Sequence, residues 1–263
     1  MEAAASDIAS AEDFAVHLKI DSGAGRLGVR PEELDKAMAE LARSPHLRLE
    51  GVSTLLANAG DPKSPVTDMQ LRVFTDALGS LEAQGFRTHY AHLANSAAIA
   101  LRADSHFNLV RPGLTLYGLP PVPAVSEALD LRPVMTFRTA VVQLKRLPAG
   151  AGVSYGHTFV TSRPSVIGIL AVGYADGYRR GLQHGGQVLV RGRRAPVVGA
   201  VCMDLTMVDL TDVPEASVGD EAVLWGRAGE EVISVNDVAR LVQTISYEML
   251  CTVGKRVPRV FHE

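Results

Sequence analysis

The chain has 263 residues, of which 47% are hydrophobic, and a formal net charge of -3 at pH 7. This length can bury a core large enough for one large domain or two smaller ones. The charge balance gives no basic footprint for nucleic acid or for an anionic membrane, and no apolar run is long enough to span a bilayer. Residues 1–7 lack a signal-peptide pattern, and Cys202 and Cys251 form neither a metal motif nor a disulfide framework. We therefore expect a soluble, cytoplasmic protein without a bound metal, a nucleic-acid partner or a membrane anchor.

Residues 17–28 combine an extended segment with a glycine-rich turn. Polar residues alternate with Leu18 and Ile20 in the first half, which is the period-2 pattern of a strand. The glycines of the second half permit positive φ or a close backbone approach. Arg26 within this turn is well placed to bind a carboxylate or phosphate. An ordinary edge strand followed by a surface arginine would show the same pattern.

Strands and helices alternate from this turn to about Gly118. The expected elements are helix 31–42, strand 46–56, helix 68–84, strand 87–92, helix 95–101 and strand 108–110. Such alternation is typical of parallel βαβ units. Four units supply only half of a (β/α)8 barrel, which needs roughly 250 residues. A partial TIM-type barrel is therefore expected in residues 1–125, in preference to a small open sheet.

Short β-branched runs dominate after the proline-rich residues 120–123. They predict strands at 135–144, 166–172, 187–190, 195–201, 207–210 and 221–225. One late helix is expected from Val235 to Val242, with Ser234 as its cap. Residues 126–263 are thus expected to form an all-β C-terminal domain, which makes the fold class α/β plus all-β.

Eight motifs, in order along almost the whole chain, resemble those of alanine racemases. They are residues 17–28, 92–97, 111–118, 153–156, 173–177, 201–204, 245–248 and 256–259. The resemblance implies a fold-type III barrel that binds pyridoxal 5'-phosphate (PLP), followed by a β-domain. It also implies a homodimer that interconverts L- and D-alanine, the latter for peptidoglycan. On this reading the chain is the C-terminal portion of such an enzyme, without the N-terminal half of the barrel.

The resemblance assigns the proton transfer to Tyr155. A racemase needs two acid–base groups on opposite faces of the α-carbon, and the family's second group is the lysine that binds PLP. None of the five lysines, Lys19, Lys36, Lys63, Lys145 and Lys255, has a matching context. Lys19 corresponds instead to a family lysine that is often carbamylated and orients the arginine matching Arg26. An alternative is that Lys19 itself binds PLP.

The resemblance also assigns the cofactor contacts. Ser96, the backbone N–H groups of Gly113 and Leu114, and the hydroxyl of Tyr247 would bind the phosphate. Ser96 could equally be a simple helix cap. Arg111 would face the pyridine nitrogen, and an arginine that keeps its proton leaves that nitrogen unprotonated, which makes the ring a weaker electron sink.

The remaining assignments concern the substrate. Arg26 and the backbone of Met203 would bind its carboxylate, and Tyr155 and Met203 would reach across the dimer interface. Tyr174, Arg180 and Ile245 match residues at the family's narrow entrance. Arg180 could equally be a surface charge, and Ile245 a core residue.

Three departures from the family pattern leave other functions open. The family usually has a histidine at Leu55, which supports the arginine matching Arg111, an acid near Gly60 and Asp61, and an arginine at Ala200. The alternatives are a serine or broad-specificity amino-acid racemase, and a truncated, non-catalytic homologue that serves as a dimerisation or phosphate-binding module.

Overall fold

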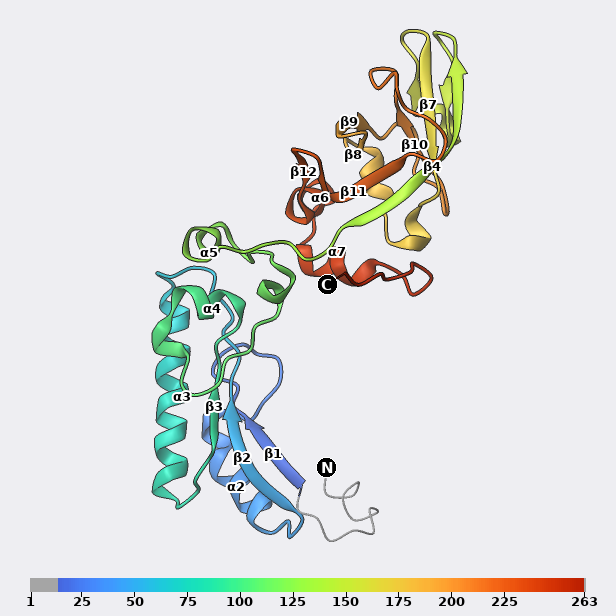
Figure 1. Cartoon of the computed structure of the whole chain (residues 1–263). Coiled ribbons are helices and arrows are strands. Elements are labelled where there is room, and N and C mark those ends of the chain that lie inside the picture. The colour runs from blue at the N-terminus through green and yellow to red at the C-terminus, as the bar shows by residue number, and fades with distance from the viewer. Residues whose placement is uncertain (1–13, 263) are drawn as a thin grey trace. The chain divides into compact units, whose positions relative to one another are not determined.

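The computed structural model describes residues 14–262, so the segment without a signal-peptide pattern lies outside the described residues. Two compact units, Met1–Arg132 and Pro133–Glu263, make up the chain (Figure 1). The change of composition near residue 125 falls within α5 (Pro123–Ala128), whose Val125 is buried in the core of the first unit. Within residues 14–262, no helix is long and apolar enough to cross a membrane.

The first unit is built on a parallel sheet with its strands in chain order. β1 (Phe14–Lys19) pairs with β2 (Leu47–Ser53), which pairs with β3 (Tyr90–His92). The helices between and after them are α2 (Leu34–Ala42), α3 (Pro65–Ala83) and α4 (Ser96–Leu101). Single 3-10 turns cover Pro31–Glu33, Ala103–Ser105 and Leu114–Tyr117. Consecutive parallel strands with intervening helices are the arrangement expected of a barrel segment.

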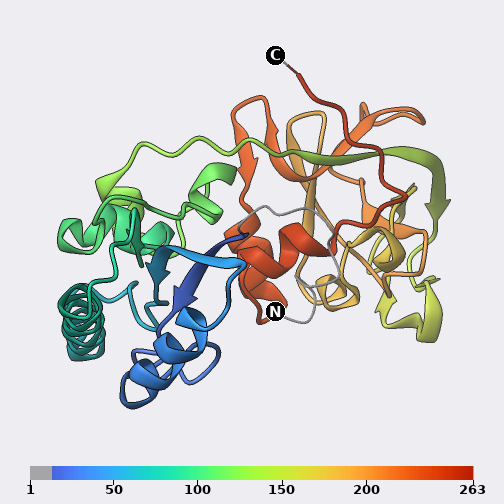
Figure 2. The same ribbon diagram turned by 90° about the horizontal axis from the view of Figure 1, so that it is seen from below.

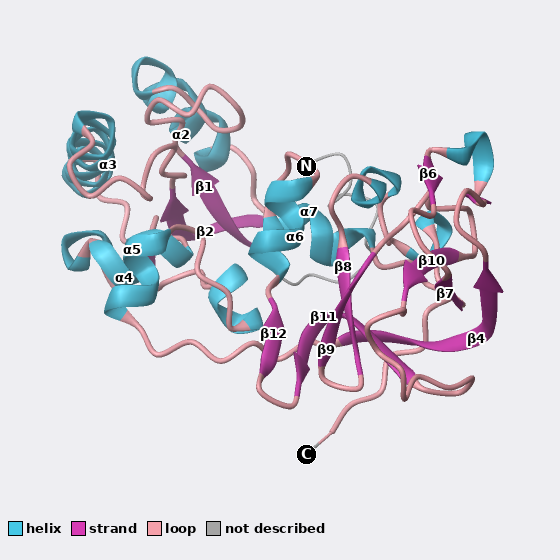
Figure 3. Ribbon diagram, turned by 90° about the horizontal axis from the view of Figure 1, so that it is seen from above, coloured by secondary structure: helices cyan, strands magenta, loops and turns pink. Residues whose placement is uncertain are grey.

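One face of this sheet is covered by helices, and the other carries polar side chains. α2 and α3 lie on the same side of the sheet (Figure 3). Ile20, just after β1, and Val52 are fully buried in the same hydrophobic core as Phe74 of α3. Because side chains alternate along a strand, His17 and Lys19 lie on the opposite face. The sequence pattern of the first strand predicted both faces correctly.

The strand expected at residues 108–110 is absent, so the described part of the first unit has three parallel strands rather than four. Asn108 instead attaches this segment to β3 through its side chain. Its Oδ1 accepts a hydrogen bond from the backbone nitrogen of Ala91 at 2.8 Å, and its Nδ2 donates to the carbonyl of His89 at 2.6 Å. Phe107, immediately before this segment, has φ 48°, in the left-handed region, so no extended run continues across it.

The second unit contains a seven-stranded antiparallel sheet in the order β10-β7-β4-β11-β8-β9, with β12 paired to β11. Its strands are β4 (Phe137–Leu147), β7 (Ser165–Leu170), β8 (Gln187–Val190), β9 (Arg193–Pro196), β10 (Thr206–Asp209), β11 (Glu221–Ala228) and β12 (Glu231–Ile233). A small separate sheet pairs β5 (Gly152–Val153) with β6 (Phe159–Val160). Trp225 is fully buried against Phe137, with ring centroids 4.6 Å apart.

Two expectations for the second unit need correction. The strand expected at 195–201 ends at Pro196, and the chain turns at Gly199, which has φ 68°. The late helix is confirmed as α6 (Val235–Leu241), and Ser234 caps it as expected, because its Oγ accepts from the backbone nitrogen of Asp237 at 3.0 Å. The number of late helices needs the second correction. A second helix, α7 (Ser246–Thr252), packs beside α6 (Figure 2). It buries only Ser246 and Met249, so its sequence shows no apolar stripe.

Candidate active site

The turn after β1 presents Arg26 on a loop held by Asp21. The Oδ1 atom of Asp21 accepts hydrogen bonds from the backbone nitrogens of Gly23, Ala24 and Gly25, at 3.1, 2.9 and 3.0 Å. These N–H groups, that of Gly23 foremost, lower the pKa of Asp21. Gly23, Gly25 and Gly28 all have positive φ, as their positions predicted. The loop is therefore ordered, and it leaves the Arg26 side chain exposed.

Ser96 is buried at the start of α4, but it is not the helix cap. That position belongs to Asn95, whose Oδ1 accepts from the backbone nitrogens of Ala97 and Ala98 at 3.2 and 3.1 Å. The Ser96 hydroxyl oxygen instead accepts from the backbone nitrogen of Gly113 at 2.8 Å, and from the backbone nitrogen of Thr115 at 3.4 Å. The capping alternative for Ser96 is therefore wrong.

This arrangement suits a phosphate group. The N–H groups of Gly113 and Thr115 converge on one oxygen atom, with the buried Leu114 between them. A Cβ built on Gly113 would meet only the Ser96 hydroxyl, at 3.8 Å, so the glycine leaves open space beside these donors. Converging backbone N–H groups next to a hydroxyl are a common way to bind phosphate oxygens. We call Ser96, Gly113, Leu114 and Thr115 the phosphate cradle.

Arg111 is held close to the phosphate cradle by its backbone and its side chain. Its backbone nitrogen donates to the carbonyl of Ala94 at 2.9 Å. Its guanidinium donates to the carbonyls of Thr54 and His92 at 2.8 and 3.0 Å, and to Nδ1 of His92. Partial burial lowers the pKa of Arg111. The guanidinium is therefore firmly oriented without a histidine at position 55.

His92 lies in one of the eight motifs, although the sequence assigned it no role. Burial, and then the positive charge of Arg111 and the proximity of His17, lower its pKa from 6.5 to about 4. A neutral imidazole can accept a hydrogen bond from Arg111, whereas an imidazolium cannot. His92 therefore supports Arg111 as a neutral acceptor.

In the second unit, Tyr155 lies on a strained turn and is 76% exposed. Ser154 just before it has φ 62°, an uncommon value for a residue other than glycine. The Ser154 hydroxyl donates to the carbonyl of Ala200 at 2.8 Å and lies 3.6 Å from Sγ of Cys202. These contacts attach the turn of Tyr155 to the segment that carries Met203. Tyr155 and Met203 line one hollow of about 690 Å³.

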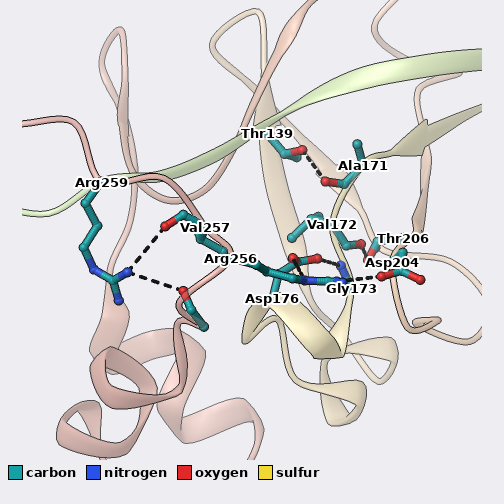
Figure 4. A network of polar contacts seen from close by, with 11 residues as sticks. Thr139, Ala171, Val172, Gly173, Asp176, Asp204, Thr206, Arg256, Val257 and Arg259 are labelled. Carbon is teal, nitrogen blue, oxygen red and sulfur yellow. Dashed lines mark hydrogen bonds and ion pairs between the residues drawn. The ribbon is translucent and has the colours of Figure 1, made fainter.

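Arg256 joins Asp204, the residue after Met203, to Asp176, in the turn that begins at Tyr174 (Figure 4). Its guanidinium forms ion pairs with Asp176 at 2.7 Å and with Asp204 at 2.6 Å. Asp176 also accepts from the backbone nitrogen of Gly173 at 2.9 Å, and the backbone nitrogen of Tyr174 donates to the carbonyl of Cys202 at 3.0 Å. The motifs contained all three charged residues, but their pairing is visible only in three dimensions.

The entrance candidates also lie in the second unit. Tyr174 and Arg180 line a hollow of about 780 Å³, together with Arg179 and His184. Ile245, at the N-terminus of α7, is 63% exposed, so it is not a core residue. Tyr247 follows in the first turn of α7, and partial burial raises its pKa.

Comparison with known proteins extends over both units. Residues 2–121 match the family model of the alanine racemase N-terminal domain, and residues 134–261 match that of the C-terminal domain. The alanine racemase of Bacillus anthracis, solved with bound L-Ala-P, superposes with a TM-score of 0.93 at 37% identity, over 100% of this chain and 68% of that one. The chain belongs to the alanine racemase family. Its first unit is accordingly part of a TIM-type barrel, and its second unit is the family's β-domain.

Other alanine racemases give the same picture. The structure from a D-cycloserine-producing Streptomyces lavendulae has a TM-score of 0.93 at 37% identity, over 100% of this chain and 69% of that one. The alanine racemase of Symbiobacterium thermophilum is 47% identical over 246 residues, which are 94% of this chain and 65% of that protein. That of Halothermothrix orenii is 44% identical over the same shares. The chain thus spans about two thirds of the length of these curated relatives.

Proposed function

We propose that this chain functions as an alanine racemase that uses PLP to interconvert L- and D-alanine. The phosphate cradle beside Arg111 carries the proposal. Buried Ser96 and the N–H groups of Gly113 and Thr115 offer a site for a phosphate, and the Arg111 backbone joins the same pair of segments through Ala94. A guanidinium fixed next to a phosphate site fits a phosphorylated heterocycle.

Four groups would hold the cofactor. They are the hydroxyls of Ser96 and Tyr247 and the N–H groups of Gly113 and Leu114, which would bind the phosphate. Arg111 would face the ring nitrogen. PLP, when bound, would supply an electron sink for the charge that develops at Cα as its proton leaves. Because Arg111 cannot give up its proton, it would keep that sink weak, which favours direct proton return over side reactions.

The remaining residues would bind the amino acid and move its α-proton. Arg26 and the backbone N–H of Met203 would bind its carboxylate, and the phenolic oxygen of Tyr155 would remove or return the proton on one face of Cα. Lys19, at the end of β1, would orient Arg26 when carbamylated. A phenol is a weak base, so cations near its oxygen would be needed to make it effective.

The exposure of these side chains supports a homodimer. Tyr155 is 76% exposed and Met203 54% exposed, so both are available to reach the cradle of a second copy. Tyr174, Arg180 and Ile245, also exposed, would then restrict the entrance. Cys202 and Cys251 are free thiols, which suits the reducing cytoplasm in which D-alanine for peptidoglycan would be made.

Two alternatives follow from particular positions. The changes at Leu55, at Gly60 and Asp61, and at Ala200 favour a serine or broad-specificity racemase if they widen the substrate site. The other alternative is a non-catalytic module that binds phosphate and dimerises, for which the phosphate cradle and the exposed Tyr155 and Met203 would be enough.

The test is proton exchange at Cα. The purified chain, with PLP in D2O, is supplied with each enantiomer of alanine and of serine, and deuterium incorporation and inversion are followed by NMR and chiral chromatography. A parallel sample contains the part of the Symbiobacterium thermophilum relative that lies outside its match to this chain. Faster exchange of alanine supports the proposal, and faster exchange of serine selects the broader racemase. A dimer without exchange in either sample selects the non-catalytic module.

A further inference from the structure

Four polar side chains form a series of contacts that starts at Arg111 and crosses the polar face of the parallel sheet. We call this series the polar network. Arg111 contacts Nδ1 of His92 on β3. Nε2 of His92 lies 2.7 Å from Nδ1 of His17 on β1. Nε2 of His17 in turn lies 4.0 Å from a carboxylate oxygen of Glu50 on β2. The polar network thus joins all three strands of the sheet.

Hydrogen-bond chemistry determines which group donates and which accepts at each contact of the polar network. A guanidinium has donors and no acceptor, so Nδ1 of His92 must be the acceptor in its contact with Arg111. The proton of a neutral His92 then lies on Nε2 and must be donated to Nδ1 of His17. His17 in turn carries its proton on Nε2, which points toward Glu50. The lowered pKa of His92 agrees with a neutral ring.

Two features of β2 make room for these contacts. Gly51 lies beside His17 in the strand register, and a Cβ on Gly51 would come within 2.6 Å of the His17 ring. The absence of that atom lets His17 on β1 reach across β2 to His92 on β3. The pairing between β1 and β2 also passes from Leu49 to Gly51 and skips Glu50. Such bulges redirect a side chain, here toward His17.

A fourth contact also restricts the His17 ring. Tyr90 on β3 stacks on it, with ring centroids 5.8 Å apart and an interplanar angle of 25°. Arg48 also pairs with Glu50 at 3.2 Å, so the carboxylate that ends the polar network is held in place. The imidazole of His17 is thus oriented by groups on β2 and on β3.

From this geometry we propose that His17 is a positioning residue for Arg111. By accepting the Nε2 proton of His92, it fixes His92 in the tautomer whose Nδ1 lone pair faces the guanidinium. This inference deepens the proposed function and rests on it, because Arg111 is the group assigned to the cofactor ring. His17 is assigned no contact with cofactor or substrate; it acts through His92.

The test compares two near-isosteric replacements. His17→Asn places an amide oxygen close to the former Nδ1 and keeps an acceptor for His92. His17→Leu has a similar volume and no acceptor. Both lose the imidazole and its stacking on Tyr90, so they differ in the one property that the proposal invokes. The tautomer of His92 is read from the ¹⁵N chemical shifts of its two ring nitrogens in the labelled chain at neutral pH.

We expect the unmodified chain and His17→Asn to show a protonated Nε2 and an unprotonated Nδ1 on His92. His17→Leu should show a mixture of tautomers, with broadened guanidinium resonances of Arg111. A protonated Nδ1 in the unmodified chain would overturn the proposal. So would a His17→Leu spectrum identical to that of the unmodified chain. If His17→Leu does not fold, as judged by circular dichroism, the tautomer of the unmodified chain still decides.

The measurement needs neither PLP nor an amino acid. A chain that gave the expected tautomers but no proton exchange would refute the proposed function and leave the role of His17 intact. Normal racemisation with the opposite tautomer of His92 would do the reverse.

Discussion

The imidazole of His17 lies so close to Gly51 that a Cβ on the glycine would approach Cε1 of His17 to 2.6 Å. This close approach across β2 is what allows a side chain of β1 to contact one of β3. A glycine at this position of a strand is otherwise unfavourable, because it packs no side chain. Its presence is explained by the space that His17 needs.

Gly51→Ala should therefore displace the His17 ring. Overpacking of this kind costs about 1–3 kcal/mol of unfolding free energy, measured by urea denaturation. The matched control is Gly79→Ala in α3, where a Cβ has nothing within 4 Å. That change should stabilise the chain by about 0.5–1 kcal/mol, because alanine is the better helix former. Equal effects of the two substitutions would contradict this explanation of Gly51.

Ser96→Ala should weaken phosphate binding. The variant removes a hydroxyl that faces the N–H groups of Gly113 and Thr115, and the loss of one such hydrogen bond costs about 1 kcal/mol or slightly more, or roughly 5- to 10-fold in affinity. Titration with PLP and with inorganic phosphate measures it. The control is Thr75→Ala, which removes an exposed hydroxyl of α3 that donates to Leu71. Unchanged affinity of Ser96→Ala for both ligands would rule out the cradle as the phosphate site.

Arg256→Gln should loosen the turn of Tyr174 and the segment of Met203 together. The guanidinium pairs with Asp176 and Asp204, one in each segment. We expect faster amide hydrogen exchange at Tyr174 and Ala175, whose N–H groups donate to the carbonyls of Cys202 and Met203. Arg132→Gln serves as the control, because its ion pair with Asp130 is almost fully exposed. Exchange rates that match those of the control would show that Arg256 does not join the two segments.

His92 should make stability depend on pH in the weakly acidic range. Its pKa in the folded chain is about 4, against an ordinary value of 6.5, so the unfolded chain binds this proton more readily. The contribution is fully present above pH 6.5 and is lost as the pH falls toward 4. Urea unfolding at about pH 7, 5.5 and 4.5 should show the decline, with a shallower slope in His92→Gln. Parallel slopes for the two proteins would assign the decline to other groups.

The residues themselves show why some features could be predicted and others could not. The alternation of polar and apolar residues from His17 to Asp21 is a local pattern, and it predicted which side chains lie on each face of β1. Residues 108–110 have the sequence pattern of a strand, but the side chain of Asn108 bonds to the backbone of Ala91 and His89 in place of backbone pairing. Whether Ser96 caps α4 depended on Asn95, one residue earlier, which is the better acceptor for the first helical N–H groups.

Long-range pairings account for the features that sequence reasoning missed. The contact between His17 and His92 spans 75 positions, and that between Arg256 and Asp176 spans 80. Both pairs lie within motifs that carry the family resemblance, yet no local pattern says which side chains meet. A histidine on the polar face of β1, two positions before Lys19, was the one available sign of the first pair.

Deuterium incorporation at Cα of alanine tests the central claim most directly, with Tyr155→Phe compared with the unmodified chain under the racemisation conditions described above. Removal of the phenolic oxygen should slow exchange from one enantiomer by about 100-fold or more, as expected for loss of a general base. PLP binding should stay unchanged. Equal exchange rates for Tyr155→Phe and the unmodified chain, from both enantiomers, would contradict the account.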